Sequence, residues 1–248
     1  MADPIIKVND VSKSYGGVKA NIDISMTVER GSITGIIGPN GCGKTTLFNS
    51  IVGYHPIDSG SIQFDNTEIS KLRVGDIARM GMLRTFQQTR IYGKMDCVDN
   101  MQISVSQREG SKNAMFASRK GEIRSRAEHL LEFVGLYSKR NLISGDLSFG
   151  QQKLLEFAMA LMNEPKVLLL DEPTAGINPT LINGLIDRLR RANEELGITL
   201  CVIEHNMRVI MNLASHIYCL SNGKMLASGK PESLQNDPRV IDAYLGGH

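Results

Sequence analysis

The sequence predicts an α/β protein with a mostly parallel central sheet, an antiparallel β-layer near its N-terminus and a helical insertion. Short apolar runs rich in β-branched residues occupy residues 33–37, 166–170 and 198–204, and a helical pattern follows each run. Continuous apolar runs are typical of parallel strands that are buried on both faces. Strand-like pieces between residues 5 and 64 indicate the antiparallel layer.

The helical patterns divide the chain into two expected parts. Residues 1–87 and 147–248 are predicted to form the α/β core with its antiparallel layer, and residues 88–146 a helical subdomain. A second amphipathic helix is predicted after Pro179. The apolar positions at helical spacing are Ile123, Ala127, Leu130, Leu131 and Val134 in the first segment and Leu181, Ile182, Leu185, Ile186 and Leu189 in the second.

Composition excludes several classes of protein. The 248 residues are 42% hydrophobic and 22% charged, which is ordinary for a globular chain. A net charge of +2 gives no general attraction to nucleic acid or anionic lipid, so no nucleic-acid partner is expected. The four cysteines lack CxxC spacing, which favours a reducing compartment. No stretch approaches the ~18 apolar residues of a membrane span, and the chain is expected to be cytosolic by itself.

Residues 38–46, GPNGCGKTT, lie between a predicted strand and a predicted helix and fit the pattern G-x-x-x-x-G-K-[ST]. Backbone N–H groups of such a loop surround phosphate oxygens, and the helix N-terminus adds a positive dipole end. Lys44 would neutralise the β- and γ-phosphates, and Thr45 would offer a hydroxyl to Mg²⁺. The predicted polyphosphate site consists of Gly38, Pro39, Asn40, Gly41, Cys42, Gly43, Lys44, Thr45 and Thr46.

Two adjacent carboxylates, Asp171 and Glu172, follow the predicted strand at residues 166–170. Ligands bind at the carboxyl ends of parallel strands in α/β sheets. Because adjacent strand residues point to opposite sides, the two side chains can have different tasks. We expect Asp171 to hold the Mg²⁺ shell and Glu172 to orient or deprotonate an attacking water.

The segment LSFGQQK, residues 147–153, pairs Ser148 with Gln151 in the spacing of a capping box. It resembles LSGGQ, the signature of ATP-binding cassette (ABC) ATPases. The resemblance implies a signature helix extending to about residue 163. It also implies that its N-terminus meets the γ-phosphate of an ATP held by a second ATPase subunit. The residues carried over from the signature are Ser148, Phe149, Gly150 and Gln151.

Three further positions match the ABC pattern in order along the chain. The resemblance implies that Tyr15, in KSYGG, stacks on adenine. It implies that Gln87, in RTFQQ, touches Mg²⁺, serves catalysis and links the core to the helical insertion. His205, in VIEHN, matches the switch histidine, which can donate a hydrogen bond to the γ-phosphate.

The sequence departs from the ABC pattern at three positions. Phe149 replaces the first glycine of LSGGQ, Cys42 stands where a small residue is usual, and Asn178 replaces the D-loop aspartate. Asn178 directly precedes Pro179, so it is expected to cap the following helix as aspartate would, without the charge.

Five segments of the sequence are similar to those of ATPase subunits of bacterial importers for branched-chain amino acids, a subgroup that also serves urea and short amides. These segments are GPNGCGKTTLFN, RTFQ, DEPTAGINP, EHNM and DPRVIDAYLG. The resemblance implies ATP hydrolysis at the cytoplasmic face of the inner membrane. It implies two transmembrane permease subunits, a second ATPase subunit, identical or related, and indirectly a solute-binding protein. The motor of lipopolysaccharide export and a soluble ABC assembly module remain alternatives.

The C-terminal segment is predicted to form a short amphipathic helix with Val240, Ile241, Tyr244 and Leu245 on its apolar face. Core packing and contact with a partner explain this face equally well.

Overall fold

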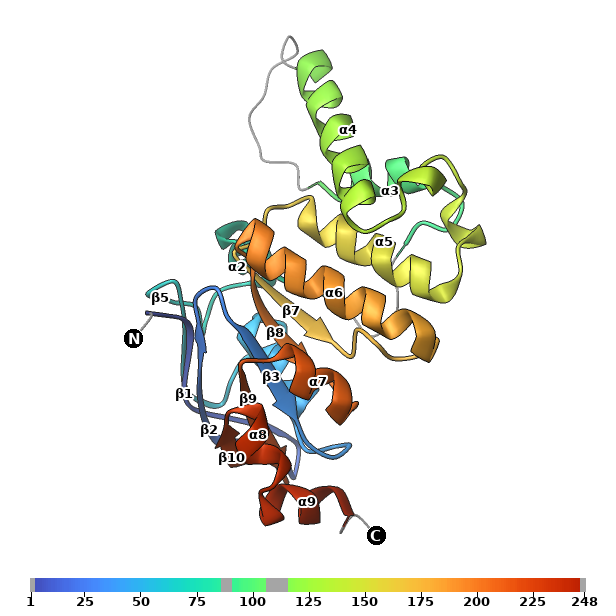
Figure 1. Ribbon diagram of the computed structural model, residues 1–248. Helices are drawn as coiled ribbons and strands as arrows, with labels where there is room; N and C mark the ends of the chain where they lie inside the picture. Colours follow the sequence, from blue (N-terminus) through green and yellow to red (C-terminus); the bar gives the residue numbers. More distant parts are fainter. Residues whose placement is uncertain (1–2, 86–90, 106–115, 246–248) are drawn as a thin grey trace. The chain divides into compact units, whose positions relative to one another are not determined.

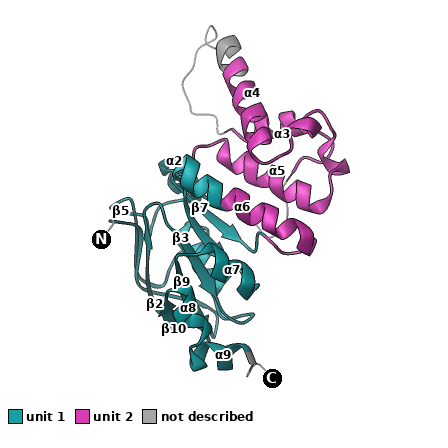
Figure 2. Cartoon of the chain, viewed as in Figure 1, with its two compact units in different colours: residues 1–84, 166–173, 190–248 teal, residues 85–165, 174–189 magenta. Residues whose placement is uncertain are grey.

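The computed structural model describes residues 3–85, 91–105 and 116–245. The chain has two compact units, which Figure 2 colours separately. Unit 1 comprises residues 1–84, 166–173 and 190–248, and unit 2 comprises residues 85–165 and 174–189. The predicted subdomain bounds, residues 88–146, stay a prediction.

Among the described residues, a six-stranded sheet in the order β10-β9-β3-β8-β7-β6 forms the centre of unit 1. Four of its strand pairs are parallel, and β10 runs antiparallel to β9, which confirms the predicted mostly parallel sheet. The strands are β3 (Ile33–Ile37), β6 (Met82–Arg84), β7 (Val167–Asp171), β8 (Thr199–Ile203), β9 (His216–Ser221) and β10 (Lys224–Gly229). In this register both Ile36 and Asp171 lie opposite Ile203, so β3, β7 and β8 end at one edge.

The second sheet of unit 1 is antiparallel, in the order β2-β1-β4-β5, as the sequence predicts for its N-terminal part. Its strands are β1 (Pro4–Tyr15), β2 (Val18–Glu29), β4 (Ser59–Phe64) and β5 (Thr67–Glu68). Ile24, Met26 and Val28 are buried and alternate with exposed residues, the pattern of a sheet with one face on the core.

Helix α1 (Lys44–Ile51) joins both sheets of unit 1 into one core. Its residues Leu47, Phe48 and Ile51 are fully buried together with apolar side chains of both sheets. Of the other helices, α7 packs on β3, and α8 and α9 pack on β10 (Figure 1). Their bounds are α2 (Val74–Met80), α7 (Met207–Leu213), α8 (Pro231–Gln235) and α9 (Pro238–Leu245).

Unit 2 is helical, as the pattern of residues 88–146 predicts. Its elements are α3 (Cys97–Ile103), α4 (Phe116–Phe133), the short 3₁₀ turns η1 (Tyr137–Lys139) and η2 (Ser144–Asp146), α5 (Phe149–Leu161) and the N-terminal part of α6 (Pro179–Leu196). Ala127, Leu130, Leu131 and Val134 are buried, and Ile123 is half-buried.

Helix α6 confirms the amphipathic helix predicted after Pro179, with one correction. Leu185, Ile186 and Leu189 are buried, but Leu181 is exposed. Leu181 lies in the first turn of α6, and helical spacing places it on the apolar face without fixing whether another element covers that end of the helix.

Candidate functional site

Two glycines give the loop between β3 and α1 its shape. Gly43 has a φ of 105°, and a Cβ there would lie 2.2 Å from the carbonyl oxygen of Ala20. Gly38 has a φ of 147°, and its Cβ would lie 2.2 Å from the carbonyl oxygen of Leu220. Glycine adopts these angles readily, and neither position has room for a side chain. The backbone angles and the close approach of neighbouring carbonyls therefore require glycine at the first and last glycine positions of the motif.

Neighbouring segments of unit 1 hold the carbonyls of this loop. Asn21 Nδ2, from β2, donates to Gly43 O at 3.1 Å. The N–H of Gly223, in the turn between β9 and β10, donates to Cys42 O at 3.1 Å. Two segments outside the loop thus hold its carbonyls in place.

Helix α9 contacts the same loop through Tyr244. The N–H of Gly38 donates to Tyr244 Oη at 2.7 Å. Burial raises the pKa of Tyr244 to about 12, so its hydroxyl stays neutral at physiological pH. The predicted C-terminal helix is present, with Val240 buried and Ile241 exposed.

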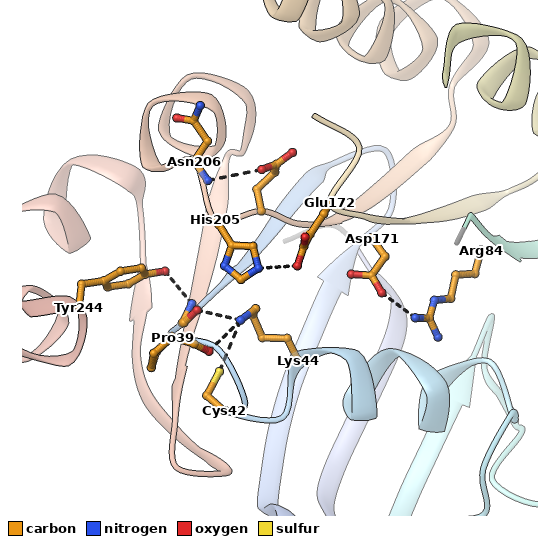
Figure 3. A network of polar contacts seen from close by, with 11 residues as sticks. Pro39, Cys42, Lys44, Arg84, Asp171, Glu172, His205, Asn206 and Tyr244 are labelled. Carbon is orange, nitrogen blue, oxygen red and sulfur yellow. Dashed lines mark hydrogen bonds and ion pairs between the residues drawn. The ribbon is translucent and has the colours of Figure 1, made fainter. Parts of the chain in front are cut away.

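Lys44, the first residue of α1, turns its ammonium back onto its own loop (Figure 3). Its Nζ donates to Gly38 O at 2.8 Å and to Pro39 O at 3.0 Å, and only 5% of the residue is exposed. Nζ also lies 3.8 Å from Cys42 Sγ. Burial raises the pKa of the Cys42 thiol, which keeps it neutral. The ammonium is therefore paired with neutral groups, and an anion at the loop would be a stronger partner.

The N-terminus of α1 has no side-chain cap, because Gly43 occupies the cap position. Its first turn contains no acidic residue either. The first N–H groups of a helix lack intrahelical partners and carry the positive end of its dipole. Thr45 is exposed at this end and Thr46 is half-buried. Together with Lys44, these groups can bind phosphate.

Asp171, the last residue of β7, forms a buried ion pair with Arg84, the last residue of β6. Arg84 Nη2 donates to Asp171 Oδ2 at 2.6 Å. Arg84 also donates from Nη1 to Asn49 Oδ1 in α1 and lies 5.7 Å from the centre of the Phe48 ring. Burial raises the pKa of Asp171, while Arg84 acts to lower it. The guanidinium thus orients the carboxylate.

The residues at this edge fit a magnesium ion. Asp171 Oδ1 is buried and has no hydrogen-bond partner among the described residues. It can therefore accept a metal ion or a metal-bound water, and the Thr45 hydroxyl is a second oxygen ligand. Within the described ranges, no three His, Cys, Asp or Glu side chains cluster to hold a metal by themselves. Phosphate and water oxygens would complete the shell, as is usual for Mg²⁺. Gln87, the third predicted ligand, lies outside the described residues.

Glu172 has a different partner from Asp171, which contacts Arg84; the different tasks predicted for the two carboxylates stay a prediction. Its φ is 51°, an unfavourable value for a residue with a side chain, and its N–H donates to Ile203 O at 2.9 Å. Glu172 Oε1 contacts His205 Nε2, and both side chains are partly exposed (Figure 3). Backbone strain of this kind, about 1–3 kcal/mol, concentrates at functional sites.

Tyr15, at the end of β1, has an exposed ring that other residues hold in place. The centre of the His55 ring lies 5.7 Å away, edge to face, and Lys13 Nζ lies 5.4 Å from the Tyr15 centroid. Lys13 in turn pairs with Asp58 at 3.0 Å. Its predicted stacking on adenine stays a prediction.

In unit 2, the predicted capping box at the start of α5 is confirmed. Gln151 N–H donates to Ser148 Oγ at 3.4 Å, and Ser148 N–H donates to Gln151 Oε1 at 3.1 Å. Helix α5 ends at Leu161, with Met162 as its C-cap.

The departures Phe149 and Asn178 also lie in unit 2. The edge of the Phe149 ring covers Gly176, where a Cβ would lie 2.9 Å from Phe149 Cε1. Asn178 Oδ1 accepts hydrogen bonds from the N–H and the hydroxyl of Thr180 at 3.1 and 2.9 Å, which confirms the predicted cap. Gly150 lies beside these residues, near Leu181 and Ile177.

The sequence alone assigned no role to Arg84, Asn49, Asn21 or Gly223. For Tyr244 it did not distinguish core packing from contact with a partner. Arg84 is the first residue of the RTFQ motif, so the sequence did single out this segment, though not the role of Arg84. Gly223 follows Asn222 between β9 and β10, and Asn-Gly is the signal of a two-residue hairpin turn, so that turn was predictable. Asn21, Asn49 and Tyr244 carry no local signal, because their partners lie far away in the sequence.

Comparison with known proteins identifies the family. The family model described as ABC transporter matches residues 22–175. The chain belongs to the ABC transporter ATP-binding family. A second model, described as branched-chain amino acid ATP-binding cassette transporter, matches residues 224–248 of this cassette.

Two similar relatives are transport ATP-binding proteins. The cassette is 36% identical over 253 residues to the high-affinity branched-chain amino acid transport ATP-binding protein BraF of Pseudomonas aeruginosa, covering 99% of each chain. It is also 36% identical to a probable branched-chain amino acid transport ATP-binding protein, LivG, of Archaeoglobus fulgidus, covering 98% of this chain and 95% of the relative.

Solved structures agree with the predicted fold. A nucleotide-free ATP-binding cassette from an ABC transporter superimposes with a TM-score of 0.87 at 32% identity, covering 98% of this chain and 99% of that one. A dimeric post-hydrolysis cassette bound to ADP and Pi superimposes with a TM-score of 0.78 at 25% identity. The match covers 91% of this chain and 98% of that one. The cassette is an ATPase subunit of a transporter. No helix in its described part is long and apolar enough to span a membrane.

The Arg84–Asp171 pair can be tested by unfolding. Arg84→Met leaves the buried Asp171 carboxylate without its counter-charge, so the free energy of unfolding should fall by about 3–5 kcal/mol. Arg84→Met/Asp171→Asn buries no unpaired charge and should recover most of that loss. Because the chain has no tryptophan, urea unfolding is best followed by circular dichroism.

Arg79→Met is the matched control, since it breaks the exposed Arg79–Asp76 pair. It should cost less than about 1 kcal/mol. Equal losses for Arg84→Met and Arg79→Met would show that the buried pair does not hold Asp171.

Proposed function

We propose that this chain is the ATP-hydrolysing subunit of an ABC importer for branched-chain amino acids or related small solutes. The observation that carries the proposal is a loop held by its neighbours, in which the Lys44 ammonium contacts two carbonyl oxygens and a neutral thiol. Beside it, Asp171 Oδ1 is buried and has no hydrogen-bond partner within the part of the chain that the structure describes. The names of the relatives and the match of residues 224–248 support the class of solute.

ATP is proposed to bind along the loop of residues 38–46, with its phosphates on the N-terminus of α1. Lys44 exchanges the carbonyls of Gly38 and Pro39 for phosphate oxygens, a charged pairing that is stronger than the neutral one it replaces. Tyr15, exposed at the end of β1, offers its ring to the adenine.

Asp171, Thr45 and Gln87 are proposed to hold Mg²⁺, which neutralises phosphate charge when it is bound. Glu172 is proposed as the general base, because its carboxylate can orient a water molecule and accept a proton. His205 holds that carboxylate through its contact with Oε1 and can donate a hydrogen bond to the γ-phosphate.

Two ATPase subunits are proposed to act together. The capped N-terminus of α5, at Ser148, Phe149, Gly150 and Gln151, would face the γ-phosphate held by the loop of the opposite subunit. A dimeric cassette is known among the similar structures. The second subunit is an identical copy or a related chain.

Two permease subunits in the membrane are the proposed partners, with the cassette peripheral on the cytoplasmic face of the inner membrane and a solute-binding protein linked indirectly. The second candidates are the motor of lipopolysaccharide export and a soluble assembly module. The match of the C-terminal residues to an amino acid transporter model favours the importer over both.

A loop cluster of unit 2 is the proposed docking surface. Tyr92 is 54% exposed, yet its backbone is fixed by buried side chains. Asn100 Oδ1 accepts from Tyr92 N–H at 2.7 Å, and Ser144 Oγ donates to Tyr92 O at 2.9 Å. The exposed Leu142 and Ile143 belong to the neighbouring segment, which bonds to residues 93–97. An exposed aromatic ring on a fixed backbone, near a segment with exposed apolar residues, suits a protein interface.

Aspartate at Ile91 and Tyr92 should reduce co-purification of the membrane subunits on the order of tenfold or more, while nucleotide affinity stays unchanged. Ile103→Asp, at an exposed apolar residue ending α3, is the control and should keep the partner. Full recovery of the membrane subunits with the Ile91/Tyr92 variant would exclude this surface.

Glu172→Gln separates ATP binding from hydrolysis, since it keeps the loop and removes the base. Hydrolysis should fall about 10²- to 10⁴-fold. Bound ATP should then favour a dimer by mass action, visible in size exclusion with ATP·Mg²⁺ and absent with ADP.

Two controls share the Glu172→Gln background. Ser148→Arg places charge and bulk in the opposing half-site and should abolish the dimer, and Lys44→Ala should abolish nucleotide binding. Hydrolysis at the parent's rate by Glu172→Gln would show that another residue is the base.

A further inference from the structure

One residue at the start of the phosphate loop is held by side chains at both of its backbone polar groups. The N–H of Gly38 donates to Tyr244 Oη at 2.7 Å, and its carbonyl accepts from Lys44 Nζ at 2.8 Å (Figure 3). Tyr244 lies 206 residues further along the chain, in α9. The C-terminal helix therefore reaches the point where β3 turns into the loop.

Helix α9 is anchored independently of this bond. Val240 is 2% exposed, and the helix packs on β10. Before its first turn, Asp237 accepts a hydrogen bond from Arg239 N–H at 2.9 Å. The Tyr244 hydroxyl is thus presented by a helix that has packing contacts of its own beside its bond to the loop.

The two contacts on Gly38 differ in what a ligand does to them. The Lys44 ammonium has three N–H donors and can turn one of them from Gly38 O to a phosphate, whereas the Tyr244 contact can persist. When Lys44 moves, the hydroxyl still fixes the Gly38 peptide, whose φ of 147° is restrained further by the backbone of Leu220 nearby.

We propose that Tyr244 is a positioning residue that holds the phosphate loop ready for nucleotide, so that α9 and the nucleotide stabilise each other. The inference rests on the proposed phosphate site. Without the hydroxyl, Gly38 N–H loses its partner and the first residue of the loop must be ordered by the ligand, which weakens binding. By reciprocity, bound nucleotide protects α9 from local opening.

The variant Tyr244→Phe removes only the hydroxyl. The dissociation constant for ADP and the KM for ATP should each rise about tenfold, the effect of one buried hydrogen bond, while kcat changes less than about twofold. Tyr218→Phe is the matched control, because Tyr218 Oη makes similar bonds to the backbone of Thr27 at 3.1 Å, away from the loop. It should lower the melting temperature without changing nucleotide affinity.

Hydrogen exchange of the parent chain gives a second readout that does not depend on a variant folding. ADP should slow exchange of the amides in residues 240–245, and this protection should be lost in Tyr244→Phe. The proposal is overturned if Tyr244→Phe binds ADP as the parent does, if Tyr218→Phe weakens binding equally, or if ADP leaves α9 exchange unchanged. Lys44→Ala tests the site itself: parent-like ADP binding there would refute the phosphate site rather than the role of Tyr244.

Discussion

The peptide groups of residues 38–43 belong to neither a helix nor a strand, so their carbonyls need hydrogen-bond partners from elsewhere. This need shapes much of unit 1. A loop that is to surround phosphate must keep its N–H groups available while its carbonyls stay satisfied. Asn21 and the Gly223 N–H bind two of those carbonyls, and Lys44 binds two others. Strand β2, the turn between β9 and β10, and α9 therefore converge on the loop, and its glycines leave them room to approach.

The parallel sheet places the candidate site residues at the same edge as the loop. Strands β3, β7 and β8 end in register, so the loop, Asp171, Glu172 and His205 all follow the same edge of one sheet. The two carboxylates then diverge. Asp171 is buried against Arg84, which leaves one oxygen available, whereas Glu172 takes a strained backbone angle and meets His205. A carboxylate held by Arg84 with one oxygen open to a metal ion, beside the partly exposed Glu172 that we propose as the base, suits hydrolysis of a phosphoanhydride bond.

Local patterns in the sequence were sufficient for β3, β7 and β8, for parts of β1, β2 and β4, for the capping box at Ser148, for the Asn178 cap and for the position of the loop between β3 and α1, whereas β6, β9 and β10 were not predicted. Each of the predicted features depends on periodicity or on spacing of a few residues. The contacts Arg84–Asp171 and Gly38–Tyr244 join residues 87 and 206 positions apart, and no short-range pattern reports such pairs. Leu181 shows the limit of periodicity, because helical spacing gives a face but not how far along the helix that face is covered.

The proposed function depends most on a loop that is held by its neighbours and in which the Lys44 ammonium is the part that moves. A crystal structure of the chain with ADP and Mg²⁺ tests this directly. We expect phosphates at the N-terminus of α1, Lys44 Nζ moved from the carbonyls of Gly38 and Pro39 to a phosphate oxygen, and positive φ angles retained at Gly38 and Gly43. Nucleotide bound elsewhere, or Lys44 still on both carbonyls and without a phosphate contact beside bound ADP, would refute this role of the loop.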